Sequence, residues 1–162
     1  MSVSQVKCFP VEARPAAPLF QGLCLLVDEV RRMPVLHPAS KRPLPGAWID
    51  LRSNDSSAAR AFDNQLTEDR LKNPDSRRTA ADIEGLSADR LAVLTVGWNL
   101  VTLSGARLDI PFNMAAAREL YAEAGMSWLR EQVVKFVFDA APWMPGTNLN
   151  SVFGADTLQP AD

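Results

Sequence analysis

The sequence predicts an α+β fold, a small N-terminal antiparallel β-sheet followed by a bundle of about four α-helices. Up to residue 51, short apolar runs are separated by prolines and a glycine, which is typical of short strands joined by turns. After residue 52, apolar residues recur at spacings of three and four, which is typical of amphipathic helices. Glycine, asparagine and proline then divide this second part into separate segments.

The length and composition indicate one globular domain with loose ends. The chain has 162 residues, of which 47% are apolar and 22% charged, an ordinary mixture for a globular protein. Residues 1–18 are rich in proline and alanine, so we expect an extended N-terminal arm. Residues 19–143 form the predicted domain, and residues 144–162, with few apolar anchors, form a predicted flexible tail.

The strands are expected from short apolar or alternating runs. Val35–Leu36 and Trp48–Leu51 fit this pattern. The main turn is predicted at His37–Gly46, because its prolines cannot donate hydrogen bonds to a ladder and its glycine is conformationally free. Leu23–Val27 is continuously apolar, and periodicity leaves strand and helix both open for residues 23–31.

The first predicted helix follows a group of capping side chains. Residues 53–56 are Ser-Asn-Asp-Ser, whose oxygens can accept hydrogen bonds from the free amides of a helix. Ala58, Phe62 and Leu66 then share one face at four-residue spacing. The helix is expected to end near Leu71, because the Asn-Pro pair after it disfavours helical backbone.

The second predicted helix begins near residue 77 and continues through Val96, ending at Gly97–Trp98. Its apolar positions are compatible with a helix, and Gly85 marks a possible break. Gly105 is then expected to reverse the chain.

Two further helices complete the predicted bundle. Asn113 is a good cap for a third helix that should close at Gly125. The fourth helix should stop before Pro142. Its apolar stripe is clear, because the side chains recur at helical spacing: Leu129, Val133, Phe136, Val137 and Ala140.

The residue types needed for catalysis or metal binding are scarce. His37 is the sole histidine, and Cys8 and Cys24 have no second pair with which to form a zinc ligand set. No glycine-rich phosphate loop or nucleophile–base motif occurs. We therefore expect a protein that is not an enzyme, with no catalytic residues, no metal and no cofactor.

Charge and hydropathy argue against two further classes of partner. The formal net charge is −2, so no general electrostatic attraction to nucleic acid is expected. The longest apolar runs are far shorter than the roughly 20 residues that a membrane helix needs. We expect protein partners, no nucleic acid, no membrane and a cytoplasmic site of synthesis.

The tryptophans are candidates either for the core or for an interface. Trp98 and Trp128 are predicted core residues. Trp143 lies between two prolines after the last helix, where it could either cover the helix end or contact a partner.

Several segments together resemble a family of small tailed-bacteriophage proteins, the tail assembly chaperones. The shared layout is a strand-forming N-terminal part, a serine–aspartate helix start, a helix ending in glycine–tryptophan, a glycine turn and two helices, over roughly residues 33–140. These segments carry the resemblance: Trp48–Leu51, Ser53–Ala59, Leu91–Ala92, Gly97–Asn99, Gly105, Ile110–Asn113 and Leu129–Val133.

The resemblance implies a non-enzymatic protein that coats the tape-measure protein during tail assembly and helps to recruit tail tube subunits. Self-association and a longer frameshifted product would fit the same family. The implied location is the cytoplasm of the infected bacterium or the virion. We expect the last helix and the residues after it to bind the partner, through Trp128, Val134, Phe138 and Trp143.

Two other functions remain open. The chain could be a structural virion component of the tail, neck or capsid, with its two ends ordered by neighbouring subunits. It could also be a phage-encoded inhibitor that binds a host defence complex.

Overall fold

The computed structural model describes residues 25–74 and 78–147. In chain order these contain strands β1 (Arg31–Leu36) and β2 (Pro43–Leu51), helices α1 (Ser57–Lys72) and α2 (Ala80–Leu94), strands β3 (Thr95–Val101) and β4 (Arg107–Leu108), and helices α3 (Met114–Ala122) and α4 (Ser127–Phe138), with single 3-10 turns at Ala124–Met126 and Ala141–Trp143. The predicted α+β class, with an antiparallel sheet and four α-helices, is confirmed. The predicted arm at residues 1–18, and all but the first four residues of the predicted tail, lie outside the described residues.

The four described strands form one antiparallel sheet in the order β1-β2-β3-β4. Alternate side chains of the strands face the core, as the two-residue period of a strand requires. Across the centre of the sheet, Met33 pairs with Ile49 and Ile49 with Trp98. All three are buried.

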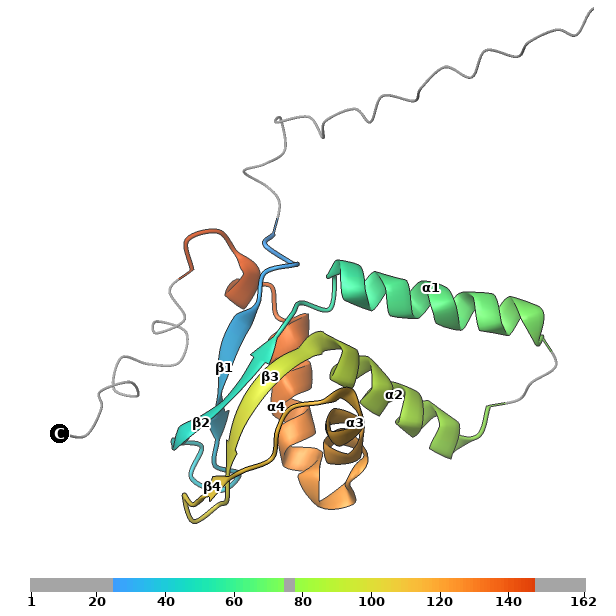
Figure 1. Cartoon of the computed structure of the whole chain (residues 1–162). Coiled ribbons are helices and arrows are strands. Elements are labelled where there is room, and N and C mark those ends of the chain that lie inside the picture. The colour runs from blue at the N-terminus through green and yellow to red at the C-terminus, as the bar shows by residue number, and fades with distance from the viewer. Residues whose placement is uncertain (1–24, 75–77, 148–162) are drawn as a thin grey trace, which may run out of the picture.

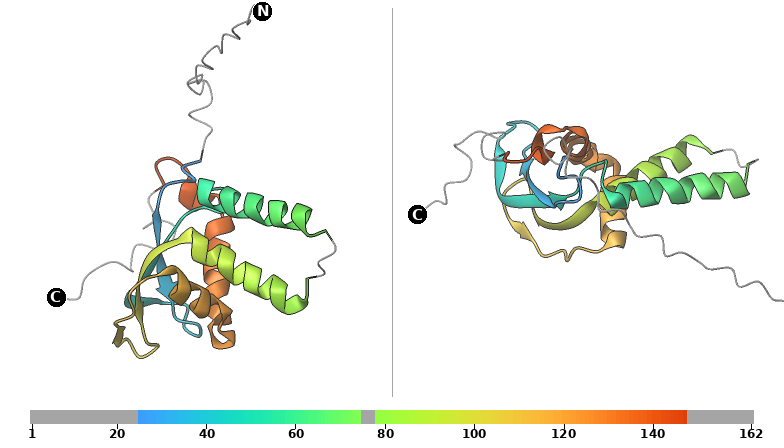
Figure 2. Two further views of the ribbon diagram at one scale, coloured as in Figure 1. Left: turned by 45° about the vertical axis from the view of Figure 1, so that its right-hand side comes forward. Right: turned by 90° about the horizontal axis from the view of Figure 1, so that it is seen from above.

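The helices form two regions (Figures 1 and 2). Helix α4 lies across one face of the sheet, and α3 packs beside it against the second half of α2. We call this two-layer part the body. Helix α1 and the first half of α2, residues 80–87, project from it, and we call this part the α1–α2 hairpin.

The prediction that helix continues through Val96 is wrong. Helix α2 ends at Leu94, and Gly97–Trp98 lie inside strand β3 rather than at a helix end. Thr95 leaves the helical conformation, and its hydroxyl donates to the Leu91 carbonyl at 2.8 Å. The following residues pair with the open edge of β2, a tertiary contact that outweighs local helix propensity.

The turn predicted at His37–Gly46 is shorter than expected. It covers residues 37–42, because β2 begins at Pro43. The recorded pairs between β2 and β3 begin at Trp48, so the two prolines of β2 occupy a stretch with a neighbour on one side. A missing N–H is tolerated there.

Two helix boundaries also differ from the prediction, and the possible break at Gly85 is absent. Thr79, which sequence reasoning missed, is the N-cap of α2 and forms a capping box with Asp82. Helix α2 runs through Gly85 without a break. Helix α3 ends at Ala122 instead of Gly125, because Glu123 adopts extended backbone before the 3-10 turn.

Other local predictions are confirmed. Ser56 caps α1 and Asn113 caps α3, each accepting a hydrogen bond from a backbone N–H of the first turn. Gly105 has a φ of +90°, which suits glycine, at the reversal between β3 and β4. Helix α4 stops at Phe138, before Pro142.

Of residues 23–31, which were left open as strand or helix, the described part is neither except at Arg31, the first residue of β1. Leu25–Val30 forms irregular backbone and a turn before β1, while Leu23 and Cys24 lie outside the described residues. In the described part of the chain, no helix is both long and apolar enough to cross a membrane.

Candidate functional site

The four predicted contact residues do not form one surface. Val134 and Phe138 lie on the outer side of α4, with 38% and 61% of their surface exposed. Trp128 is partly buried at the edge of the core, so its predicted core position is confirmed in part. Trp143 is fully buried, with 0% exposed.

Trp143 covers the end of α4, which is one of the two roles that the sequence left open. The 3-10 turn folds the chain back, and the Trp143 N–H donates to the Ala140 carbonyl at 3.0 Å. The indole ring meets Phe136 edge-on, with ring centroids 5.7 Å apart. The Trp143 carbonyl accepts a hydrogen bond from the Leu26 N–H at 2.8 Å. Its side chain is therefore a core element rather than part of the free surface.

Val134 lines a groove between α2 and the outer side of α4. This α2–α4 groove has a volume of about 420 Å³ and is lined by Glu84, Ser87, Arg130, Glu131, Val134 and Lys135. Arg130 is partly held in place, because its guanidinium donates to the Tyr121 carbonyl at 3.1 Å. The groove combines one apolar side chain with charges of both signs.

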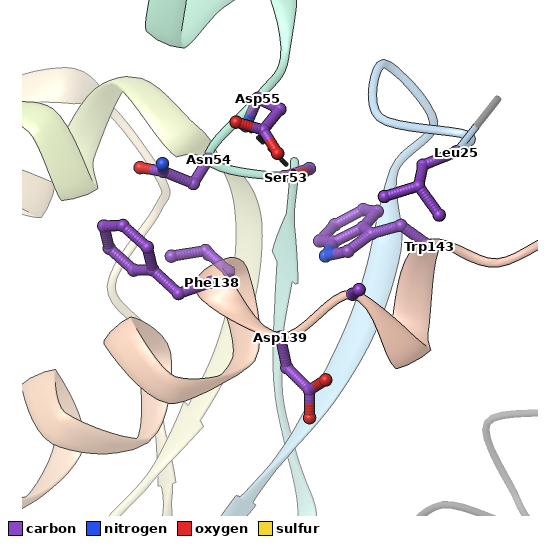
Figure 3. A pocket seen from close by; sticks show the side chains of 9 residues that line it. Leu25, Ser53, Asn54, Asp55, Phe138, Asp139 and Trp143 are labelled. Carbon is purple, nitrogen blue, oxygen red and sulfur yellow. Dashed lines mark hydrogen bonds between the residues drawn. The ribbon is translucent and has the colours of Figure 1, made fainter.

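Phe138 lines a second hollow at the C-terminal end of α4. It has a volume of about 140 Å³, and Figure 3 shows its side chains. Its walls come from the segment before β1, from the β2–α1 connection and from the end of α4: Leu25, Ser53, Asn54, Asp55, Val137, Phe138, Asp139, Ala140 and Trp143. We call it the α4-end hollow.

Two backbone features fix the walls of the α4-end hollow. The Asn54 N–H donates to the Val137 carbonyl at 3.0 Å, which ties the β2–α1 connection to α4. The Asp55 N–H donates to the Ser53 hydroxyl at 3.2 Å, drawn as a dashed line in Figure 3. These bonds satisfy groups that would otherwise be unpaired near the helix end.

Val134 and Phe138 are one helical turn apart, so they stand next to each other on α4. We call this pair the α4 ridge. It connects the α2–α4 groove with the α4-end hollow, because each residue lines one of the two. The ridge places exposed apolar surface between two concave areas, an arrangement suited to binding a protein segment.

The root of the α1–α2 hairpin is held near this site by a polar cluster. Arg90 of α2 pairs with the Asp63 carboxylate and also donates to the Asn54 side-chain oxygen at 3.1 Å. At the same root, the Ser57 N–H donates to Asp28 at 2.6 Å. This hydrogen bond holds the pKa of the Asp28 carboxyl below its usual value.

The remaining sequence candidates have local or untested roles. The Nδ1 atom of His37 accepts hydrogen bonds from the Ala39 and Ser40 amides, so this residue stabilises the β1–β2 turn. Cys8 and Cys24 lie outside the described residues. Within residues 25–74 and 78–147, no group of three or more His, Cys, Asp or Glu residues could hold a metal ion.

Sequence reasoning missed the residues that face α4 from other elements. Asn54, Glu84 and Ser87 reach the site through the packing of segments far apart in the chain. Each is an ordinary polar residue of a cap or helix surface, so no local signal marked it.

The chain matches no protein-family model, no curated protein and no solved structure.

Proposed function

We propose that this protein acts without enzymatic chemistry, by binding other proteins during the assembly of a bacteriophage tail. The proposed partners are the tape-measure protein and the tail tube protein, and the proposed location is the cytoplasm of the infected bacterium. The partner class rests on the family resemblance of the sequence. The choice of binding surface is based on the structure.

The observation that carries the proposal is the exposed α4 ridge. Phe138 has 61% of its surface exposed although the neighbouring Val137 is buried. Contiguous exposed apolar surface rimmed by polar groups marks protein-binding sites, and Val134 and Phe138 are adjacent on α4. Aromatic side chains, phenylalanine included, are enriched at protein interfaces relative to the rest of the surface.

Parts of the resemblance are also present in the fold. The strand at Trp48–Leu51, the cap at Ser56, the turn at Gly105 and the cap at Asn113 all occur. The helix ending at Gly97–Trp98 does not, because this segment is a strand. The partner class is therefore supported by the resemblance of the other segments only.

The direct test is binding of the purified chain to a fragment of the tape-measure protein of the same phage. Phe138→Asp should weaken this binding by about thirtyfold, the loss expected of a hot spot worth ~2 kcal/mol. Leu71→Asp is the matched control. It also places a charge at an exposed apolar position, but on the α1–α2 hairpin, and it should leave the affinity unchanged.

Unchanged affinity in Phe138→Asp would show that the ridge is not the binding surface, provided that circular dichroism shows a folded variant. Equal losses in both variants would indicate general damage or another surface. Absence of binding by the unchanged chain would contradict the proposed partner.

A second measurement separates the proposal from a structural role in the virion. Quantitative mass spectrometry of infected-cell lysate and of purified particles should find the chain abundant in the lysate and absent from particles. Stoichiometric retention in particles would instead favour a component of the tail, neck or capsid.

A further inference from the structure

The α4-end hollow contains a buried hydrogen-bond donor without an acceptor. The Nε1 atom of Trp143 is covered and has no hydrogen-bond partner among the residues that the structure describes. Figure 3 shows the nitrogen on the ring edge that faces Phe138 and not Leu25. The indole N–H can only donate, and buried donors in native proteins are nearly always paired. This donor is therefore free to pair with an acceptor atom that a ligand brings into the hollow.

The size of the hollow limits what can enter it. Its volume is about 140 Å³, and an apolar cavity of ~150 Å³ can hold one benzene molecule. There is room for one apolar side chain and not for a large cofactor. The apolar part of the lining comes from Leu25, Val137, Phe138, Ala140 and Trp143.

The charge around the hollow is of one sign. Asp55 and Asp139 are both exposed and line it from different elements, on opposite sides of the hollow in Figure 3. Neither carboxylate forms an ion pair with a described residue, and no basic side chain lines the hollow. A cationic group next to the bound side chain would be attracted to this rim.

We propose that the α4-end hollow binds a short partner peptide in which an apolar residue is followed by lysine or arginine. The apolar side chain fills the hollow, a backbone carbonyl of the peptide accepts from Trp143 Nε1, and the basic side chain lies near Asp55 or Asp139. Because Nε1 is covered in the free protein, the proposed binding requires the link at Asp139–Ala140 to open slightly. The inference rests on the proposed function, since Phe138 belongs to both surfaces.

The test is a titration of the full-length, ¹⁵N-labelled chain with the acetylated and amidated peptide GSLKGS, followed through the indole N–H signals. The Trp143 indole proton should move downfield and reach a plateau. The Trp98 indole N–H, which already donates to the Ile110 carbonyl at 2.9 Å, is the internal reference and should not move. The peptide GSAKGS should give a much smaller shift, because alanine cannot fill the hollow.

Three variants make the assignment specific. Ala140→Leu enlarges an exposed side chain that lines the hollow, and it should abolish the shift. Ala122→Leu, at an exposed position at the end of α3, is the matched control and should preserve it. Asp55→Asn with Asp139→Asn should weaken GSLKGS binding by about two- to fivefold, as expected for exposed ion pairs.

An unmoved Trp143 indole proton, or equal shifts with GSLKGS and GSAKGS, would overturn the inference. The proposed function and the peptide site can be refuted independently. If the tape-measure fragment binds through Phe138 without moving the Trp143 signal, the proposed function stands and the peptide site is wrong. If GSLKGS moves the signal but the fragment does not bind, the peptide site stands and the proposed partner is wrong.

Discussion

The body and the α1–α2 hairpin differ sharply in how they are stabilised. In the body, the sheet and α4 enclose large side chains that are almost completely buried, among them Ile49, Leu51, Val133 and Trp143. Along α1, from Ser57 to Lys72, Ala59 is the one buried residue. The first half of α2 has its apolar Ile83 exposed. One region is held together by packing, whereas the other depends on caps and on the polar cluster at its root.

This difference shows how the fold divides its tasks. Side chains in a close-packed interior have few alternative arrangements. The body can therefore hold the α4 ridge, the α2–α4 groove and the α4-end hollow in fixed positions. A helical hairpin with little buried surface opens locally at low cost. The α2–α4 groove lies where these two regions meet, because Glu84 and Ser87 come from the hairpin and Val134 from the body.

The largest expected effect compares one apolar truncation in each region. Ile49→Ala should lower the free energy of unfolding by about 2–5 kcal/mol, because it leaves a cavity at the centre of the sheet. Leu71→Ala should change it by less than about 0.5 kcal/mol, because that side chain is 77% exposed. Urea unfolding measures both, and similar losses would show that the hairpin is packed as tightly as the body.

The next effect is a pH dependence of folding stability, and it arises from a residue of the body. Burial raises the pKa of Tyr121 to about 12 from its ordinary value of 10.0, although a hydrogen bond to Thr95 lowers it slightly. Between pH 10 and 12 the unfolded state therefore loses this proton more readily than the folded state, and stability falls as pH rises. The loss should reach about 2 kcal/mol at pH 12.

Tyr121→Phe is the control for that prediction, because it removes the sole tyrosine of the chain. The difference in urea midpoint between the unchanged chain and this variant should narrow or reverse above pH 10. A constant difference from pH 8 to 11 would contradict the burial of the hydroxyl.

A smaller effect separates the root of the hairpin from its tip. Ser56→Ala removes a buried cap whose hydroxyl accepts from the Ala59 N–H at 3.3 Å, and it should cost about 1 kcal/mol of global stability. Thr79→Ala removes the cap at the exposed start of α2. It should speed hydrogen exchange in residues 80–86 and leave the urea midpoint almost unchanged. Equal midpoint shifts would mean that the tip unfolds together with the body.

The smallest expected effect is acid-induced loosening of the hairpin. The pKa of Asp28 is lowered by the Ser57 N–H, and that of Asp82 by the Thr79 N–H. The two ionised carboxylates stabilise the folded protein above the ordinary carboxyl pKa of 3.8. This stabilisation is lost as the pH falls through their lower pKa values in the folded state. Amide signals of Ser57 and Thr79 should therefore shift below pH 4, and Asp28→Asn should remove the shift at Ser57 alone.

The sequence predicted local features better than long-range ones. The caps at Ser56 and Asn113 and the reversal at Gly105 depend on neighbouring residues, and they are confirmed. The start of β3, Thr95–Val96, was predicted as the end of a helix, because the pairing of this strand with β2 crosses more than 40 residues of chain and is not visible in the local sequence.

The candidate site was predictable to a similar degree. Phe138 and Val134 could be found because α4 has a readable period, and their exposure follows from the buried stripe beside them. The burial of Trp143 could not be read from the sequence, since it results from a turn that folds the residue back onto α4. The hollow that it lines needs three separate segments to be brought together.

Hydrogen exchange of the full chain, alone and with the tape-measure fragment, tests the central claim most directly. Partner binding at the α4 ridge should slow exchange at Asn54–Asp55, at residues 80–87 and at the C-terminal end of α4, while strand β1 stays unchanged. Protection confined to β1 and β2, or none anywhere in the chain, would contradict it.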